Sequence, residues 1–119
     1  MKVHIKFSDM ERDEALRAYA EEKMNMFSKY IDRALFDASV CGIEFKKSTH
    51  HQKGDVCYAE VTLETNGTLY RASTEASSLR EAVDTVKDEI MRQISRNKEK
   101  KENIFRKGSR LAKRLLRGV

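Results

Sequence analysis

Hydrophobic and polar residues alternate from the start of the chain. In residues 2–7, Val3, Ile5 and Phe7 take every second position and basic residues take the others. A period of two predicts a β-strand that buries one face and exposes the other. The same kind of pattern predicts three more strands, over residues 39–47, 56–65 and 68–74.

Two other segments repeat their apolar residues at helical spacing, which predicts two amphipathic helices. The first lies within residues 8–32, with Asp13 as its N-cap. Its apolar stripe consists of Leu16, Tyr19, Ala20, Met24, Phe27, Tyr30 and Ile31. The second helix begins at Ser78, which fits a capping box with Glu81. Its stripe consists of Leu79, Val83, Val86, Ile90 and Ile94.

Turn signals between these elements indicate how the strands connect. Residues 48–55 are predicted to form a loop with a turn at Gly54. Asn66-Gly67 is a strong hairpin signal because both residues tolerate positive φ, so the last two strands are expected to be antiparallel. The first two strands are joined by the first helix, and such a crossover connection makes them parallel. The order β-α-β-β-β-α predicts an α+β fold: a four-stranded sheet with both helices packed on one face and water on the other.

The second helix is predicted to continue beyond the sheet. After Ile94, the positions that extend its apolar stripe are Asn97 and Lys101, and both favour contact with water. Because the buried stripe stops there, the helix is expected to leave the core at this point.

A helix end is predicted at Lys107-Gly108, since glycine commonly follows the last helical residue. Residues 109–117 then predict one more short helix, separate from the long one. The chain is therefore expected to consist of an α+β domain over residues 1–103 and a basic C-terminal helical tail over residues 104–119.

Positive charge is concentrated at the C-terminal end. Residues 96–119 hold ten basic and two acidic residues, a net charge of +8. Residues 1–95 hold fourteen basic and seventeen acidic residues, a net charge of −3. Such asymmetry suggests contact with nucleic acid or an anionic membrane. Within this C-terminal segment, the residues expected to contact RNA include Lys98, Lys101, Lys107, Arg110, Lys113 and Arg114.

The sequence lacks the common catalytic and cofactor motifs. It has no phosphate-binding glycine loop, no His-Glu-x-x-His and no Cys-x-x-Cys. Cys41 and Cys57 occupy inward strand positions, where a small buried hydrophobe is the usual state of cysteine. The neighbouring His50 and His51 point differently, whereas zinc needs four convergent ligands. We therefore expect no enzymatic activity, no cofactor and no bound metal.

The same features bear on the cellular compartment. No apolar run approaches the roughly 20 residues that span a bilayer. The alternating residues 2–7 do not resemble a signal peptide. Two cysteines do not form a disulfide framework, so the reducing cytoplasm is the expected location.

Several basic residues of the two helices lie off their apolar stripes. Arg92 and Arg96 are one helical turn apart and continue towards Lys100, and a solvated helix face is the alternative to an RNA contact. Lys23 instead falls near the middle of the first stripe. It either extends past the edge of the core or emerges where the two helices meet.

Three segments, residues 11–30, 58–73 and 82–101, carry a family resemblance in their order and spacing. Together they are similar to the ribosome hibernation-promoting factor family, which includes the ribosome-associated inhibitor protein Y. The resemblance covers residues 1–101 and implies the same β-α-β-β-β-α fold, related in architecture to double-stranded-RNA-binding domains. Long family members carry a second, dimerising C-terminal domain, and this chain resembles the short form.

The resemblance also implies which residues contact RNA, because the family's basic helix residues face ribosomal RNA in the decoding region. The matching positions are Arg17, Lys23, Lys29, Arg92, Arg96 and Lys100. The chain departs from the family pattern at Met26-Phe27, at residues 78–80 and at Glu89, where a lysine is common. These departures shift the expected electrostatic contribution towards the tail.

The expected function is that of a non-enzymatic ribosome hibernation factor. It would bind small-subunit ribosomal RNA in the groove for messenger and transfer RNA, compete with both, and inhibit translation while preserving idle ribosomes. It is expected to be a monomer off the ribosome. Two other functions stay open: a generic structured-RNA-binding module, and a membrane-surface protein attached through residues 109–117. A disordered tail that only raises solubility is the simplest alternative for the C-terminal segment.

Overall fold

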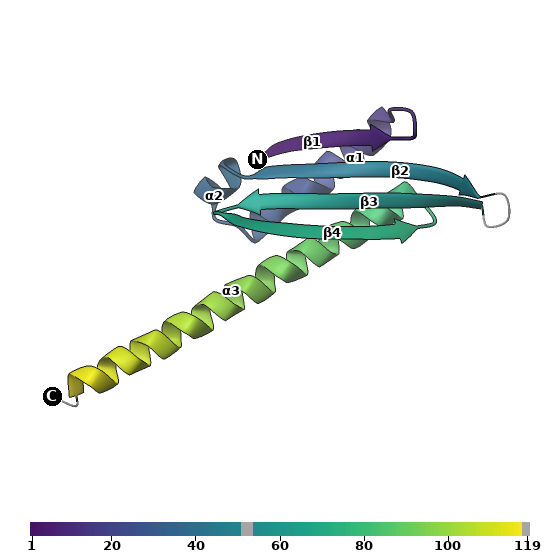
Figure 1. Cartoon of the computed structure of the whole chain (residues 1–119). Helices are drawn as coiled ribbons and strands as arrows, with labels where there is room; N and C mark the ends of the chain where they lie inside the picture. Colours follow the sequence, from purple (N-terminus) through teal and green to yellow (C-terminus); the bar gives the residue numbers. More distant parts are fainter. Residues whose placement is uncertain (51–53, 118–119) are drawn as a thin grey trace.

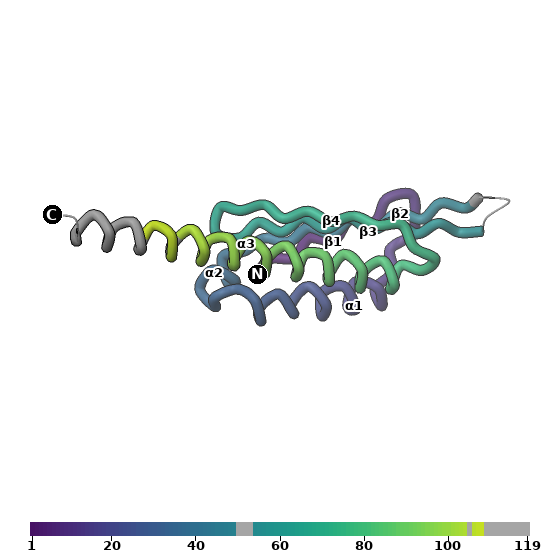
Figure 2. Tube along the Cα trace, turned by 90° about the horizontal axis from the view of Figure 1, so that it is seen from below, coloured from purple at the N-terminus to yellow at the C-terminus, as the bar shows by residue number. Residues whose placement is uncertain are grey.

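The chain forms two layers, a four-stranded sheet and a layer of helices on one of its faces (Figure 1 and Figure 2). The structure, a computed structural model, describes the backbone of residues 1–50 and 54–117. It describes their side chains except those of His50, Phe105 and residues 109–117. The α+β class and the placement of the main helices on one face are confirmed.

The sheet has the strand order β1-β2-β3-β4, with β1 at Lys2–Ser8, β2 at Val40–His50, β3 at Gly54–Thr65 and β4 at Thr68–Ala76. The β1–β2 pair is parallel and the other two pairs are antiparallel, as the sequence predicts. Asn66 and Gly67 have φ angles of 49° and 74° at the β3–β4 turn. The hairpin prediction at this pair is therefore confirmed.

The predicted loop over residues 48–55 is mostly strand instead. Ser48 pairs with Val56 and Thr49 pairs with Asp55 in the β2–β3 ladder. The Thr49 hydroxyl also donates to the Asp55 carboxylate at 3.0 Å. The loop prediction fails at these positions because Thr49 and Asp55 bond to each other across the ladder, which continues through them. Residues 51–53 lie outside the described part of the chain.

The first helix is shorter than predicted. The α-helix α1 covers Glu14–Asn25, and the Asp13 side chain caps it by accepting from the Leu16 N–H at 3.0 Å. The chain then tightens into the 3₁₀ helix η1, Met26–Lys29, and a short helix α2 follows at Arg33–Asp37. The sequence predicted neither change. The tighter turn keeps Phe27 fully buried but leaves Tyr30 43% exposed, so Tyr30 departs from the predicted stripe. Ile31, the last predicted stripe residue, still packs against the core.

The last helix, α3, is a single element over Leu79–Arg117. The Glu81 N–H donates to the Ser78 hydroxyl at 3.1 Å, which confirms half of the predicted capping box. The Glu81 carboxylate accepts from Ser77 instead of completing the box. The predicted helix end at Gly108 is wrong, because α3 continues through it. An isolated glycine with ordinary helical φ costs about 1 kcal/mol relative to alanine but does not break a helix.

The core lies between the sheet and the helices. Its largest fully buried side chains include Met24 and Phe27 from the α1–η1 layer, Phe45 and Leu63 from the sheet, and Ile90 from α3. Both cysteines are free and buried. Burial raises the pKa of the Cys41 thiol to about 12, so this group stays protonated and inert at neutral pH. In the described part of the chain, no helix combines the length and apolarity needed to cross a membrane.

The helix α3 runs obliquely to the strands and continues beyond the sheet, which elongates the molecule (Figure 1). Ile94 is the last α3 residue in the core, and Asn97 makes a final polar attachment by donating to the Tyr70 hydroxyl at 2.8 Å. Residues 98–117 then run past the end of the sheet, and we call them the α3 extension. At the helical rise, these twenty residues span about 30 Å. The molecule measures 73 × 31 × 18 Å as a result.

Candidate nucleic-acid interface

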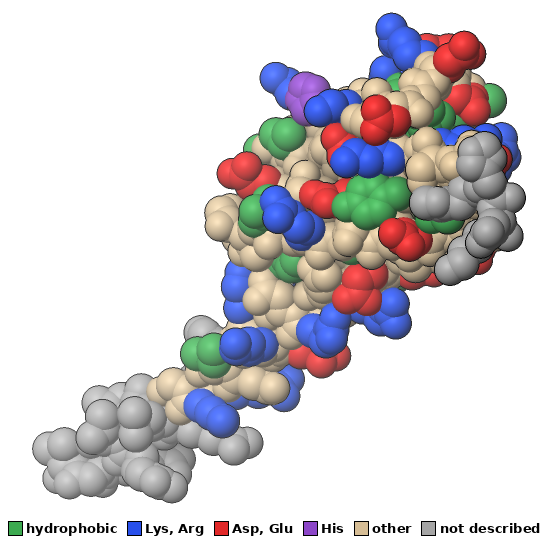
Figure 3. Space-filling model, turned by 45° about the vertical axis from the view of Figure 1, so that its right-hand side comes forward, with side chains coloured by type: hydrophobic (Ala, Val, Ile, Leu, Met, Phe, Trp, Pro, Cys, Tyr) green, Lys and Arg blue, Asp and Glu red, His purple; other side chains and the backbone are tan. Residues whose placement is uncertain are grey.

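The α3 extension presents a series of exposed cations. The described ones are Lys98, Lys100, Lys101, Arg106 and Lys107. Within the described residues, none of these five forms an ion pair with a carboxylate, and Figure 3 shows Lys and Arg side chains where α3 leaves the body. Cations that are not already neutralised within the protein are available to bind phosphate. Arg110, Lys113 and Arg114 belong to the same helix, but their side chains lie outside the described part.

Arg92 and Arg96 lie near each other on α3, where they share one carboxylate. Arg92 Nη2 is 2.9 Å from one Glu89 oxygen, and Arg96 Nη2 is 3.1 Å from the other. Gln93 Nε2 also approaches Glu89, at 3.3 Å, and donates to the Arg71 carbonyl at 2.9 Å. Both arginine side chains are 67% exposed. The structure therefore brings the two predicted arginines together, but with an internal anion between them.

The sequence interpretation noted Glu89 only as a lost positive charge. The sequence spacing could have predicted these two ion pairs. Residues three positions apart, and residues seven positions apart across two turns, lie on one helix face. A carboxylate at position 89 can reach Arg92 and Arg96 by that spacing. Glu89 is therefore a candidate functional residue that sequence reasoning missed.

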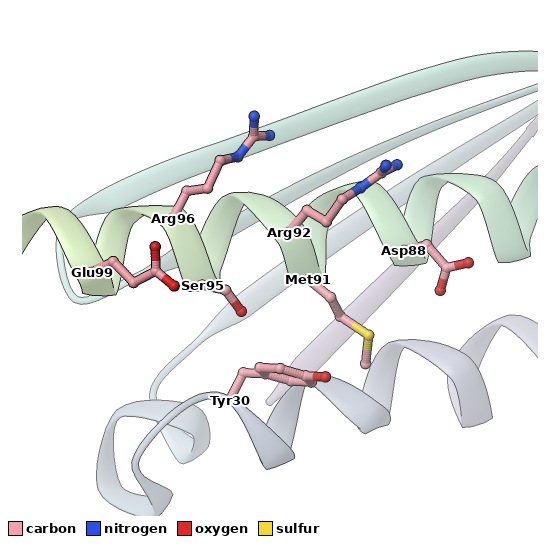
Figure 4. A pocket seen from close by; sticks show the side chains of 7 residues that line it. All are labelled: Tyr30, Asp88, Met91, Arg92, Ser95, Arg96 and Glu99. Carbon is pink, nitrogen blue, oxygen red and sulfur yellow. The ribbon is translucent and has the colours of Figure 1, made fainter.

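A groove separates η1 from α3 beside these arginines (Figure 4). We call it the Tyr30 groove; its volume is about 610 Å³, and it is lined by Tyr30, Asp88, Met91, Arg92, Ser95, Arg96 and Glu99. Tyr30 had been assigned to the buried stripe of the first helix. No sequence signal would have found it, because its exposure follows from the tightening of the chain into η1.

The predicted basic residues of the first helix have different surroundings. Arg17 lies 3.6 Å from Glu14 and 3.7 Å from Glu21, and its side chain is only 28% exposed, so two carboxylates already neutralise it. Lys29 is exposed at the end of η1 and has no ion pair among the described residues. Of these two cations, Lys29 is the more available to a phosphate.

Lys23 lies at the seam between α1 and α3. Its Nζ is 5.3 Å from the centre of the Tyr19 ring, and Arg80 Cζ is 4.9 Å from the same ring. The Tyr19 hydroxyl donates to Asp84 on α3 at 2.6 Å. This hydrogen bond, followed by burial, raises the pKa of Tyr19. Lys23 therefore emerges where the two helices meet, the second of the two placements that the sequence left open.

The open face of the sheet carries balanced charge. Lys6 and Lys46 lie 3.4 and 3.6 Å from Glu44, and Arg71 lies 3.8 Å from Glu60. Partial burial acts to raise the pKa of Glu44, but the two lysines outweigh it and hold the pKa below its ordinary value. Figure 3 shows acidic and basic side chains interspersed on the body. On the α3 extension, by contrast, none of the five described cations has an ion pair among the described residues.

No group of three or more His, Cys, Asp or Glu side chains converges as a metal site in the part of the chain that the structure describes. The His50 side chain and all of His51 fall outside that part, so the sequence expectation for this pair stays a prediction. The membrane alternative also stays untested, because it depends on side chains of residues 109–117, which are not described.

The chain is similar to proteins named for ribosome hibernation in several bacteria. The ribosome hibernation promoting factor of Escherichia coli K12 is 28% identical over 100 residues, which are 84% of this chain and 96% of that protein. The protein of the same name from Azotobacter vinelandii is 30% identical over 100 residues, 84% of this chain and 85% of that protein. The ribosome hibernation promotion factor of Picosynechococcus is 29% identical, but this chain spans about half of its length, 50%.

Two solved structures share the fold. The N-terminal domain of Protein Y from Thermus thermophilus superposes with a TM-score of 0.65 at 23% identity, covering 81% of this chain and 98% of that one. A ribosomal subunit interface protein from Coxiella burnetii also gives a TM-score of 0.65, at 18% identity, covering 83% and 99%. At these identities the likeness establishes the arrangement of helices and strands.

The sequence of the domain decides the family. A family model described as sigma 54 modulation protein / S30EA ribosomal protein matches residues 3–102, which run from the second residue of β1 through the other three strands and along α3 to Glu102. The chain therefore belongs to the sigma 54 modulation protein / S30EA ribosomal protein family.

Proposed function

We propose that this protein is a ribosome hibernation factor that binds small-subunit ribosomal RNA in the groove used by messenger and transfer RNA. It inhibits translation there while preserving the idle ribosome. The observation that carries the proposal is the α3 extension, a helix of about 30 Å with five described cations that no internal carboxylate neutralises. Family membership supports the ribosome as the target.

The geometry suits recognition of folded RNA. Such RNA is recognised through shape, phosphates and 2′-hydroxyls more than through sequence. A helix that leaves the body can follow an RNA backbone over its whole length, while Arg92 and Arg96 supply planar donors nearer the core. Binding of this kind blocks a site by occupying it. It needs no catalysis, and it is consistent with a cytoplasmic monomer that competes with messenger and transfer RNA.

Sedimentation with purified small subunits tests this proposal. The full chain should sediment with the subunits, should be displaced by excess messenger and transfer RNA, and should inhibit translation in a cell-free system. A salt titration should show log K falling steeply with log salt, since each neutralised phosphate contributes a slope of about −0.9. Equal affinity for an unrelated structured RNA would favour the generic RNA-binding module and remove the ribosome as the specific target.

A further inference from the structure

We propose that the Tyr30 groove is a binding subsite for one unstacked nucleobase of the bound RNA. The base would stack on the ring of Tyr30, and its phosphate would lie against Arg92 and Arg96 on the adjacent face of α3. This inference rests on the proposed function, because it names a further contact with the same RNA. The basic residues of the proposed function would contact only the RNA backbone.

Tyr30 is presented in a way that suits stacking. Tyr30 is 43% exposed, although it follows directly on η1, whose Phe27 is fully buried in the core. The Tyr30 N–H donates to the Phe27 carbonyl at 2.9 Å, so a tight turn anchored in the core holds the backbone below the ring. A rigid, exposed aromatic ring is the usual platform for a splayed-out RNA base.

The four tyrosines of the chain differ in how their hydroxyls are used. Tyr19 donates to Asp84, Tyr58 donates to Glu60, and Tyr70 accepts from Asn97. Tyr30 alone has no such partner among the described residues. It therefore contributes to no internal polar network and buries only part of its ring, which leaves the ring free for a ligand.

The groove has the size and lining for a nucleotide. Its volume of about 610 Å³ lies within the range of small-molecule sites. Figure 4 shows the Tyr30 ring opposite Met91 and Ser95 of α3, while the Arg92 and Arg96 side chains extend away from the ring. The apolar face for a base and the cations for its phosphate are thus on neighbouring faces of one helix.

Two acidic side chains restrict where the phosphate of a bound nucleotide can lie. Asp88 and Glu99 line the groove on either side of the Met91–Ser95 stretch. They repel a phosphate from the groove itself and confine it to the arginine side. Their oxygens can instead accept hydrogen bonds from the exocyclic amines of a base or from a ribose 2′-hydroxyl. This combination fits RNA better than a free anion.

Tyr30→Leu tests the stacking contact, with small ribosomal subunits as the probe. Stacking on an aromatic side chain predicts that affinity falls by about tenfold when the ring is removed. The slope of log K against log salt should not change, because no phosphate contact is lost. Tyr30→Phe keeps the ring and should bind within about twofold of the wild type.

Tyr58→Leu is the matched control, because it removes a partly exposed tyrosine from the sheet, where it donates to Glu60 and lies near Lys46. It should leave affinity unchanged, and thermal melting should show that all three variants are folded.

A wild-type chain that fails to bind small subunits would remove the proposed function and this inference together. A wild-type chain that binds, with Tyr30→Leu binding equally well, would overturn this inference alone.

Ultraviolet cross-linking of the wild-type complex gives a second measurement that does not depend on a variant. Mass spectrometry should find Tyr30 joined to a nucleotide of the small-subunit RNA. A cross-link from Tyr30 to a ribosomal protein would overturn the inference, since a peptide side chain would then occupy the groove.

Discussion

The Glu89 carboxylate lies 2.9 Å from the guanidinium of Arg92, within the part of α3 that carries the predicted RNA-binding arginines. Its second oxygen lies 3.1 Å from Arg96. In the free protein, one internal anion therefore occupies the donors that a phosphate would use. A bound RNA phosphate must either displace the Glu89 carboxylate or lie beside its negative charge. Both cases lower the affinity for RNA.

Glu89→Gln should strengthen binding to small subunits. Exposed ion pairs are each worth about 0.2–1 kcal/mol, so freeing two arginines should tighten binding by roughly two- to thirtyfold. Filter binding at fixed salt measures the change. Glu75→Gln is the control, because it removes one negative charge from an exposed strand residue with no ion pair among the described residues. Equal gains in both variants would mean that only net charge matters.

Arg92→Glu combined with Arg96→Glu should abolish inhibition of cell-free translation without unfolding the protein. Both side chains are 67% exposed, so the core does not depend on them, and the reversal places three carboxylates where phosphates would bind. Lys2→Glu with Lys46→Glu makes the same charge change at exposed positions of the sheet and should inhibit almost normally. Full inhibition by a folded Arg92/Arg96 variant would exclude this part of α3 from the interface.

Deletion of residues 104–119 should weaken binding while preserving the fold. It removes six basic residues and no acidic one, leaving eighteen basic against nineteen acidic, a net charge of −1. The core is unaffected because its last α3 residue is Ile94. Affinity should fall at least about tenfold at moderate salt, and the salt slope should shrink by several units as counterion release is lost. Unchanged affinity and slope would show that this segment does not contact RNA.

Gly108→Ala should increase helix content. A Cβ at position 108 would meet no atom within 4 Å, and alanine favours the helix over glycine by about 1 kcal/mol. Circular dichroism at 222 nm measures the gain, and Gly108→Pro should lower the signal. If the helix instead ended here with Gly108 in the left-handed conformation, alanine would destabilise that end and the signal would fall.

The strand order and the core were largely determined by sequence pattern. A period of two in residues 2–7 and the Asn66-Gly67 turn were sufficient to predict a strand and a hairpin, because a sheet with one wet face requires alternation. The helical stripe from Val83 to Ile94 likewise predicted which face of α3 is buried. These features are local: each depends on which side of a regular element faces the core.

The candidate site depended on tertiary structure for a different reason. The sequence located the positive charge on the end of the chain, since charge is a property of composition. It could not show that Tyr30 leaves the apolar stripe, because the turn to η1 occurs where Phe27 packs into the core. Gly108 predicted the end of a helix, whereas α3 continues through it. Periodicity fixes which face is buried, whereas only packing between elements decides where a helix tightens and which side chains line a groove.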